Sequence, residues 1–402
     1  MKKILVSALE SSANLHLREV LAHLDGQICG IFDSAMMSKG LGIGAGGAKQ
    51  SDGNSEIPGA GNSQILGDEI SRIPEISSDK ISEISQISSA KSAQNSLKFD
   101  APLYESSEFN AMGFVEVLPL VFKAKRAMLD MTLLARDCDA VLLVDSPAFN
   151  LRLARMIKSA RIATPVTYYI LPQVWAWKRG RVRQVEAFCD QLASILPFDA
   201  DFYTRAQYVG HPLIDELGGV RNAPQSGTLV FMPGSRKSEI SRLMPIFREV
   251  ARAIAAPRNL LVVPEHFANS QIYGDTSDFI ITHDAPAALS MGEFGFICSG
   301  TATLQAALVG MPFVLCYKAK AIDIAIARAF VKVRHAGLAN IICDFCGEPP
   351  MHEELIQEQV SAANLIEIYR TFDRVKFMQK CAKLHKYLAH GSAENVAKMI
   401  KG

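Results

Sequence analysis

The stretch GTLVFMPGSRKSEI, residues 227–240, has the pattern of a β-strand that turns directly into an α-helix. The apolar run TLVFM has the length of a strand, and Pro233 and Gly234 end it. We expect the helix to begin near Ser238. A helix that follows a strand returns the chain to the starting edge of the sheet, so the next strand pairs in parallel. The stretch therefore predicts a parallel α/β sheet.

Similar strand-like runs alternate with helix-length amphipathic segments along most of the chain. In order they are KKILVSAL, ICGIFD, AVLLVD, PVTYYIL, TLVFMPG, LLVVP, FIITH, FGFICSG and PFVLCY. With 402 residues, 49% of them apolar and 21% charged, the chain can bury two cores. The predicted fold class is α/β, with two doubly wound, Rossmann-like domains facing a cleft.

The boundary between the domains is expected near YVGHPLIDEL, residues 208–217, where Gly210 and Pro212 interrupt the pattern. The expected divisions are a first domain at 1–209, a second at 210–385, and a C-terminal helix at 386–402. We expect this last helix to return to the first domain or to pack on a partner subunit.

Charge and cysteine usage limit the classes of partner and compartment. The net charge is +1, so no overall field attracts nucleic acid, and an anionic partner must be met by local clusters of cations. The eight cysteines are scattered through apolar segments, which favours a reduced, cytoplasmic location. The first apolar run is broken by Ser7 and ends at Glu10, too short for a signal peptide, and we expect a strand there. No run approaches the roughly 18 apolar residues of a membrane span.

One segment fits neither domain. Between Asp33 and Lys98 there is no aromatic residue; glycine is frequent first, and Ser-Ile triplets follow. We expect a mobile, disordered insertion at 43–100 with no chemistry of its own. Isoleucines that recur every three residues leave a short solenoid-like or amphipathic element as the alternative.

The opening stretch also predicts an anion-binding turn. Free backbone N–H groups at a helix start, with Gly234, Ser235 and Arg236 beside them, suit a diphosphate. The alternative is an ordinary strand-to-helix turn capped by serine.

A second stretch, FICSGTATLQAAL at 296–308, repeats this geometry. Its strand ends at Ser299, Gly300 and Thr301, and Gln305 follows one helical turn later on the same face as Thr301. The glycine allows close approach of backbone to phosphate, and the amide of Gln305 suits a ribose hydroxyl. Two such turns in one domain predict a nucleoside diphosphate.

Two motifs of the first half carry side-chain chemistry. AVLLVDSPAFN, residues 140–150, brings Asp145 to the carboxyl end of an apolar strand, where α/β proteins place their sites; a turn or cap is the alternative. In YYILPQVWAWKRGRVR, residues 168–183, Trp175 and Trp177 precede four cations. That stretch predicts either a core ring beside a solvated helix start, or a wall that meets an apolar, anionic ligand.

Three weaker motifs do not suffice for a metal site, and we expect neither a metal nor a cofactor. Cys343 and Cys346 have metal-ligand spacing but lack a second pair. The Asp199-Ala-Asp201 sequence is expected in a surface loop, and His211 is expected to be structural.

Seven short motifs together resemble the lipid-A-disaccharide synthases, a family of B-type glycosyltransferases. They are MGFVEVLP (112–119), VDSPAFN, YYILPQVWAW, LPFD, YVGHPLID, MPGSR and SGTATLQ. The resemblance covers the chain except for about 43–100. The chain departs from the family pattern at LESSAN (9–14), where GEPSGD is usual, and at Gln305, where a glutamate is usual.

The resemblance implies an inverting hexosyltransferase. It would move 2,3-diacylglucosamine from UDP-2,3-diacylglucosamine to 2,3-diacylglucosamine 1-phosphate, giving the β-1,6-linked disaccharide 1-phosphate and UDP. It implies peripheral association with the anionic cytoplasmic face of the inner membrane, and it leaves a homodimer open. Such an acceptor needs an apolar wall and cations together, as the tryptophan stretch offers.

The resemblance also implies roles for particular residues. Asp145 is the expected catalytic base and Glu10 the reserve base. The expected UDP site comprises Gly234, Ser235, Arg236, Ser299, Gly300, Thr301 and Gln305. The expected acceptor and membrane side comprises Val115, Val117, Leu118, Val121, Phe122, Lys123, Lys125, Arg126, Trp175 and Trp177. The alternatives are a UDP-sugar epimerase of the same fold and a non-catalytic UDP-sugar-binding protein.

Overall fold

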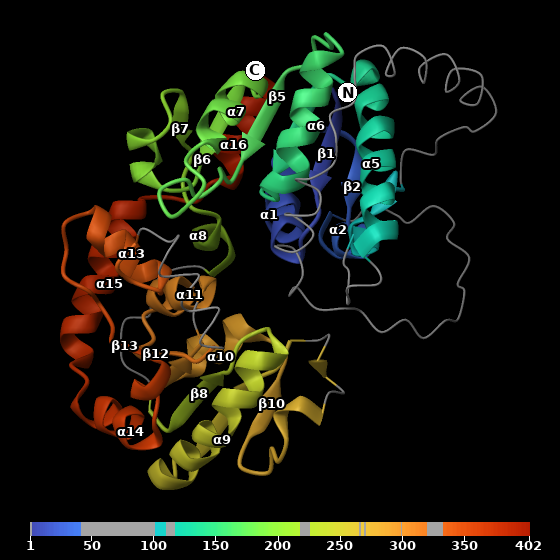
Figure 1. The fold of residues 1–402 in the computed structure, drawn as a ribbon. Helices are drawn as coiled ribbons and strands as arrows, with labels where there is room; N and C mark the ends of the chain where they lie inside the picture. The colour runs from blue at the N-terminus through green and yellow to red at the C-terminus, as the bar shows by residue number, and fades with distance from the viewer. Residues whose placement is uncertain are drawn as a thin grey trace. The chain divides into compact units, whose positions relative to one another are not determined.

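The chain folds into two units (Figure 1). A computed structural model describes residues 2–41, 101–109, 117–217, 226–264, 267–268, 271–298, 300–319 and 333–402, with backbone only at 38–41 and 117–119. The expected insertion at 43–100 lies outside the described residues. The first unit comprises Met1–Val174, Lys178–Pro212 and Gly391–Gly402, and the second comprises Trp175–Trp177 and Leu213–His390.

The first unit contains a seven-stranded parallel sheet in the order β3-β2-β1-β4-β5-β6-β7. Its strands are β1 (Lys2–Ala8), β2 (Gly26–Phe32), β3 (Tyr104–Glu105), β4 (Ala140–Val144), β5 (Val166–Tyr169), β6 (Gln191–Ser194) and β7 (Ala206–Tyr208). Its helices are α1 (Ser11–Leu21), α2 (Ser34–Leu41), α5 (Val117–Leu134), α6 (Pro147–Ser159), α7 (Arg181–Phe188) and α16 (Ala393–Lys401).

Alternating side chains of β1 supply both cores of the first unit. Leu5 packs into a cluster with α5, α6 and α7, whereas Ile4 and Val6 pack into a cluster with α1 and α16. Successive side chains of a strand point to opposite faces, so one buried strand can serve two helical layers.

The second unit contains a six-stranded parallel sheet in the order β10-β9-β8-β11-β12-β13. Its strands are β8 (Thr228–Met232), β9 (Arg258–Val262), β10 (Ile280–Thr282), β11 (Phe294–Ile297), β12 (Phe313–Tyr317) and β13 (Glu354–Ile356). Its helices are α8 (Pro212–Leu217), α9 (Lys237–Ile254), α10 (Ala285–Met291), α11 (Thr301–Val309), α13 (Leu338–Phe345), α14 (Ala362–Thr371) and α15 (Arg374–Leu388).

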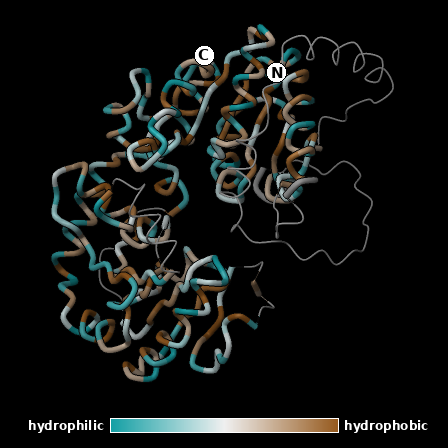
Figure 2. Tube along the Cα trace, in the orientation of Figure 1, coloured by the Kyte–Doolittle hydropathy of each residue, from teal (hydrophilic) through white to brown (hydrophobic). Residues whose placement is uncertain are grey.

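Short 3₁₀ helices complete the described structure. They are η2 (Ser106–Phe109), η4 (Ala135–Asp137), η5 (Pro197–Asp201), η7 (Gln271–Tyr273) and η8 (Gln357–Gln359). Hydrophobic stretches run along the sheet strands, whereas the covering helices alternate between hydrophobic and hydrophilic residues (Figure 2). Among the described helices, none combines the length and the apolar character that a bilayer crossing requires.

The C-terminal helix α16 packs on α1 and β5, in the first unit. The Asn395 side-chain amide donates a hydrogen bond of 2.9 Å to the carbonyl of Val209, and the hydroxyls of Tyr169 and Ser392 lie 2.5 Å apart. The chain therefore ends in the unit where it begins.

The strand order places one topological switch point in each sheet. In the first sheet it lies between β1 and β4, and in the second between β8 and β11. At such a point the connections leave in opposite directions, and the carboxyl ends of the two strands are open to a ligand. The residues that follow these four strands are therefore the first place to look for chemistry.

Candidate active site

Two carboxyl groups lie at the switch point of the first unit. Ala8 of β1 is paired with Val144 of β4, so Glu10 and Asp145 follow neighbouring strands at the same sheet edge. Glu10 is the residue immediately before α1. The Ser146 hydroxyl lies 3.5 Å from Glu10 Oε1 and is placed to donate to it.

The backbone at Asp145 and Ser146 is left-handed, with φ of 49° and 43°. Two consecutive non-glycine residues in this region cost on the order of 1–3 kcal/mol each. Pro147 begins α6 and keeps the residue before it out of the helical conformation. Strain of this kind persists only where the surroundings impose it, and it is concentrated at functional sites.

Hydrogen bonds hold this strained turn in place. The Tyr168 hydroxyl donates to the Asp145 carbonyl at 2.6 Å, and the Asn150 amide donates to the carbonyls of Val144 and Asp145 at 3.1 and 2.8 Å. Asn150 in turn accepts from the Ser7 hydroxyl at 2.6 Å. The Asp145 main chain is thus fixed from two elements, β5 and α6.

The surroundings of the two carboxyl groups raise the pKa of each. Burial, and then repulsion by Asp145, raises the pKa of Glu10 to about 7. Burial also raises the pKa of Asp145, opposed by the Ser146 backbone N–H and by the charges of His16 and Arg181. A carboxyl that titrates near neutral pH is suited to acid–base catalysis.

Sequence reasoning assigned no role in this site to His16, Arg181 or Tyr168. His16 lies on α1 and Arg181 is the first residue of α7. The available signal was that His16 and Arg181 follow strands of the sheet, whereas Tyr168 lies near the carboxyl end of β5 itself. His211 is buried, and burial lowers its pKa to about 3, so it is neutral near pH 7.

In the second unit, two turns lie side by side at the switch point. Met232 of β8 pairs with Ile297 of β11, and each strand is followed by a glycine before a helix. Gly234 has φ of +99°, and a Cβ there would lie 2.5 Å from Glu239 Oε2. This position needs glycine for both conformation and space.

The first turn ends at α9, which begins at Lys237, one residue before the expected start. Arg236 is its N-cap residue, and its guanidinium donates to Glu239 Oε1 at 2.8 Å. The Arg236 side chain is 48% exposed, whereas that of Glu239 is 6% exposed. A buried carboxylate therefore orients a partly exposed cation at the helix start.

The second turn has a different reason for its glycine. Gly300 has φ of +85° and precedes α11, but a Cβ there would meet no atom within 4 Å. Its carbonyl accepts from the Thr303 hydroxyl at 2.9 Å. Thr301 is exposed and Gln305 is half-buried one turn later, while Ser299 lies outside the described residues. The turn presents helix N–H groups that suit an anion.

The tryptophan stretch divides into a buried and a partly exposed part. Trp175 is 4% exposed, and its ring packs edge-to-face on Phe345 with centroids 5.9 Å apart. Trp175 thus packs within the second unit, as the core-ring alternative predicts, and its place on an acceptor wall stays a prediction. Trp177 is half-buried, and Lys178 and Arg179 are exposed.

Helix α5 carries the expected membrane-side residues that can be described. Phe122 is 66% exposed, and Val121 is half-buried. Lys123 pairs with Glu108 at 2.5 Å, and Arg126 pairs with Asp130 at 3.0 Å. The cations here are therefore partly neutralised. Val115 lies outside the described residues, and the side chains of Val117 and Leu118 are not described; Lys125 is half-buried.

The expectation of a surface loop at Asp199 is wrong. Its side chain accepts from the Ser194 hydroxyl at 2.6 Å and the residue is 2% exposed. Burial raises the pKa of Asp199 to about 7. Within the described parts of the chain, no group of three or more His, Cys, Asp or Glu side chains is placed to hold a metal ion.

The two parallel sheets, each with polar groups at its switch point, define a protein of the B-type glycosyltransferase fold. The calicheamicin glycosyltransferase CalG4 has this arrangement, with a TM-score of 0.53 and 14% identity over 100% of this chain and 98% of that one. A UDP-GlcNAc 2-epimerase from Neisseria meningitidis, bound to UDP-GlcNAc, has a TM-score of 0.52 and 10% identity over 99% and 98% of the two chains.

Sequence comparison gives the particular family. The family model described as lipid-A-disaccharide synthetase matches residues 93–399. The lipid-A-disaccharide synthase of Campylobacter jejuni (strain RM1221) is 42% identical over 417 residues, spanning 100% of this chain and 99% of that protein. That of Helicobacter acinonychis (strain Sheeba) is 46% identical over 317 residues, or 74% and 87%. The chain belongs to the lipid-A-disaccharide synthase family and is a glycosyltransferase.

Proposed function

We propose that this enzyme transfers 2,3-diacylglucosamine from UDP-2,3-diacylglucosamine to 2,3-diacylglucosamine 1-phosphate. The products are the β-1,6-linked disaccharide 1-phosphate and UDP. Membership of the family supports the substrate pair. The observation that supports the chemistry is the carboxyl pair Glu10 and Asp145 at the switch point of the first sheet.

In the proposed reaction, the 6-hydroxyl of the acceptor attacks the anomeric carbon of the donor. The new C–O bond forms as the bond from that carbon to the UDP oxygen breaks, which inverts the anomeric centre. Asp145 accepts the proton of the hydroxyl, a role worth on the order of a hundred- to ten-thousandfold in rate. Its fixed, left-handed turn favours it over Glu10 because a base must be held in one geometry.

The charge that develops on UDP is proposed to be stabilised in the second unit. The N–H groups at the starts of α9 and α11 and the guanidinium of Arg236 supply positive potential from preorganised groups. Ser235, Thr301 and Gln305 are proposed to contact the diphosphate and the ribose.

The proposed partner on the acceptor side is the anionic cytoplasmic surface of the inner membrane. Phe122 projects from α5 beside Lys123, Lys125 and Arg126, which combines an apolar group with cations. Trp177, which is half-buried where Trp175 is buried, is the more accessible candidate of the tryptophan stretch for contact with an acyl chain.

A UDP-sugar 2-epimerase activity is the second candidate, because the Neisseria meningitidis epimerase shares the fold. The test is to incubate the purified protein with both diacylglucosamine substrates and analyse the products by mass spectrometry. The disaccharide phosphate and UDP in equal amounts are expected. Epimerised donor without UDP release would replace the proposal with the second candidate, and absence of any turnover would favour a binding protein.

A further inference from the structure

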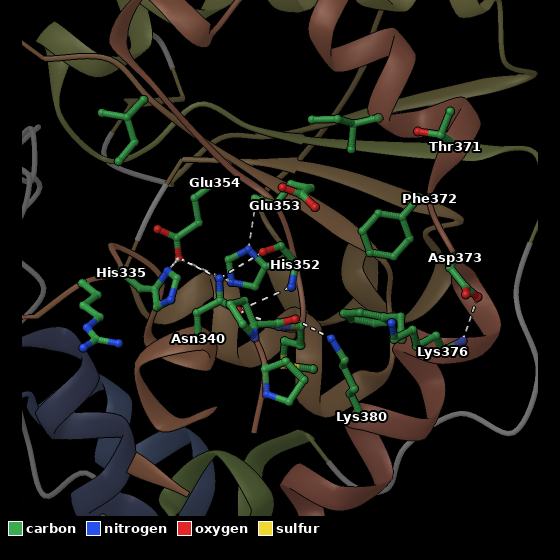
Figure 3. Close-up of a pocket in the computed structure, with 17 residues that line it drawn as sticks. His335, Asn340, His352, Glu353, Glu354, Thr371, Phe372, Asp373, Lys376 and Lys380 are labelled. Atoms are coloured by element: carbon green, nitrogen blue, oxygen red, sulfur yellow. Dashed lines mark hydrogen bonds and ion pairs between the residues drawn. The ribbon is translucent and has the colours of Figure 1, made fainter. Parts of the chain in front are cut away.

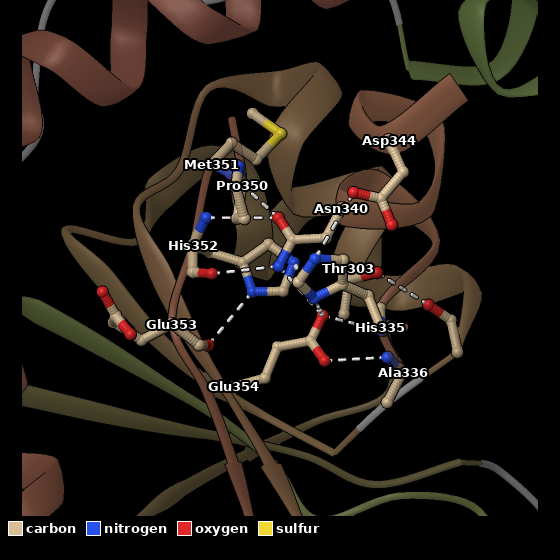
Figure 4. Close-up of polar contacts among 12 residues, drawn as sticks. Thr303, His335, Ala336, Asn340, Asp344, Pro350, Met351, His352, Glu353 and Glu354 are labelled. Atoms are coloured by element: carbon tan, nitrogen blue, oxygen red, sulfur yellow. Dashed lines mark hydrogen bonds and ion pairs between the residues drawn. The ribbon is translucent and has the colours of Figure 1, made fainter. Parts of the chain in front are cut away.

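A polar cluster in the second unit surrounds the carboxylate of Glu354. This residue begins β13 at the wall of a cavity of about 780 Å³ (Figure 3). Its oxygens accept hydrogen bonds from the backbone N–H of Ala336 at 2.7 Å, the backbone N–H of Gly337 at 3.1 Å and the Asn340 amide at 2.9 Å (Figure 4). The Glu354 side chain is only 9% exposed. Three donors converge on two oxygens, so both oxygens must act as acceptors.

The loop held by this carboxylate reaches the second anion-binding turn. Gly337 forms an isolated parallel β-bridge with Gly300, the residue before α11. Glu354 therefore fixes the backbone that lies directly against the Gly300 turn. A Cβ at Gly300 would meet no atom within 4 Å, so the space beside this residue is open. The bridge to Gly337 is a backbone contact that holds the turn.

His352 holds the same loop from a second direction. A Cβ at Gly337 would lie 2.8 Å from the His352 ring, so the loop can come this close to the ring only with glycine at position 337. The His352 ring packs on Phe313 with centroids 4.3 Å apart and the ring planes tilted by 37°, and the His352 side chain is fully buried. Burial lowers the pKa of His352 to about 3, which leaves it neutral near pH 7. The buried, uncharged ring therefore limits the positions that the backbone at Gly337 can take.

Asn340 joins the cluster to the chain before β13. Its amide donates to the His352 carbonyl at 3.0 Å, and its carbonyl oxygen accepts from the Met351 N–H at 2.9 Å. The side-chain oxygens of Glu354 and the amide of Asn340 are all hydrogen-bonded, which makes this part of the cluster rigid.

We propose that Glu354 is a positioning residue for the sugar-nucleotide donor: its carboxylate holds 336–337 against Gly300 and so sets the turn that receives the diphosphate. This inference rests on the proposed function, because it assumes that the Gly300 turn binds UDP. Glu354 acts through Gly337 and does not touch the reacting atoms. Donor binding should depend on it more than chemistry does, because the carboxyl pair lies in the other unit.

The test compares Glu354→Gln with Glu353→Gln, an exposed neighbour that lines the same cavity. An amide keeps the shape but turns an N–H₂ donor toward backbone donors. We expect UDP to bind about tenfold more weakly to Glu354→Gln by calorimetry, and KM for the UDP-sugar to rise about tenfold with kcat within about twofold. Glu353→Gln should match the parent in all three values.

A second variant reaches the loop without altering the carboxylate. Gly337→Ala pushes against His352 and should also weaken UDP binding severalfold, whereas Gly180→Ala, whose Cβ meets no atom within 4 Å, should not. Melting curves of all variants show whether each is folded at the assay temperature. If folded Glu354→Gln or folded Gly337→Ala binds UDP as the parent does, the inference is overturned.

Arg236→Ala separates this inference from the proposed function. It should weaken UDP binding whatever the role of Glu354, because the guanidinium lies at the start of α9. Loss of binding in Arg236→Ala with parental binding in Glu354→Gln overturns the positioning role and keeps the proposed site. Parental binding in both variants overturns both.

Discussion

The switch points of the two units share a topology but differ in chemistry. In the first unit the turn after β4 carries side chains in left-handed conformations, at Asp145 and Ser146. In the second unit glycines occupy that region of φ, at Gly234 and Gly300. The proposed base therefore stands on a strained turn, whereas the two turns of the proposed diphosphate site use glycine, which adopts a positive φ without strain. In the proposed function, the first sheet supplies the base and the second sheet supplies the site for the diphosphate.

The largest effect should come from replacing Asp145, the proposed base in the first unit. Asp145→Asn keeps the size of the side chain and its tolerance of the left-handed conformation, so stability should fall by about 1 kcal/mol or less. We expect kcat to fall by about a hundredfold or more, while UDP affinity, supplied by the other unit, stays near the parental value.

The measurements for Asp145→Asn are kcat for disaccharide formation, UDP binding by calorimetry and a melting curve. Glu10→Gln, assayed in parallel, is the matched control for the second carboxyl. Near-parental turnover by folded Asp145→Asn would show that Asp145 is not the base. Glu10 would then be the proposed base.

The next effect concerns the stability of the first unit as a function of pH. The pKa of Glu10 is raised to about 7 from 4.5, so the folded protein binds this proton more tightly than the unfolded chain does. The resulting stabilisation is full below pH 4.5 and is lost as pH rises through 7. Relative to Glu10→Gln, the parent should lose about 2 kcal/mol of unfolding free energy between pH 4.5 and 8.

Urea unfolding of the parent and Glu10→Gln at several pH values gives this difference directly. Parallel profiles for parent and Glu10→Gln would show that neither burial nor Asp145 raises the pKa of Glu10 in the folded protein.

A smaller effect should distinguish the two glycines of the second unit. Gly234→Ala introduces both backbone strain and a clash with Glu239, whereas Gly300→Ala introduces strain alone. We expect Gly300→Ala to lose about 1 kcal/mol of stability and Gly234→Ala about 1–2 kcal/mol more. Thermal unfolding measures both. Equal losses would mean that Glu239 moves aside without penalty.

The smallest effect should come from the surface of α5 in the first unit. Replacing Lys123, Lys125 and Arg126 by serine should weaken binding to anionic vesicles by less than about 1 kcal/mol per charge, because Glu108 and Asp130 already pair with two of these cations. Vesicle sedimentation at low and high salt measures it, with a larger difference at low salt.

Two controls make the vesicle measurement specific. Glu108→Gln should tighten binding by releasing Lys123 from its partner. Lys383→Ser, at an ion-paired cation of the second unit, should leave binding unchanged. Equal effects from Lys383 and the α5 cations would show that the membrane does not distinguish the two units.

The sequence alone determined the two parallel sheets and the residues at several strand ends. Alternating strands and helices leave few arrangements other than doubly wound sheets, so the positions of Asp145 and of the two glycine turns could be predicted. The motif order also predicted the family that the comparisons show. These features are local: a strand, a turn and a helix start are specified by neighbouring residues.

Only the tertiary structure decided which strand ends are neighbours and which side chains are buried. Asp145 contributes to the raised pKa of Glu10 because β1 pairs with β4, although the two segments are far apart in the chain. Trp175 and Asp199 are buried by packing that their local sequence does not specify. Glu354 reaches the Gly300 turn through Gly337 for the same reason. Strand order and side-chain packing depend on long-range contacts, and a short stretch of sequence does not contain its partners.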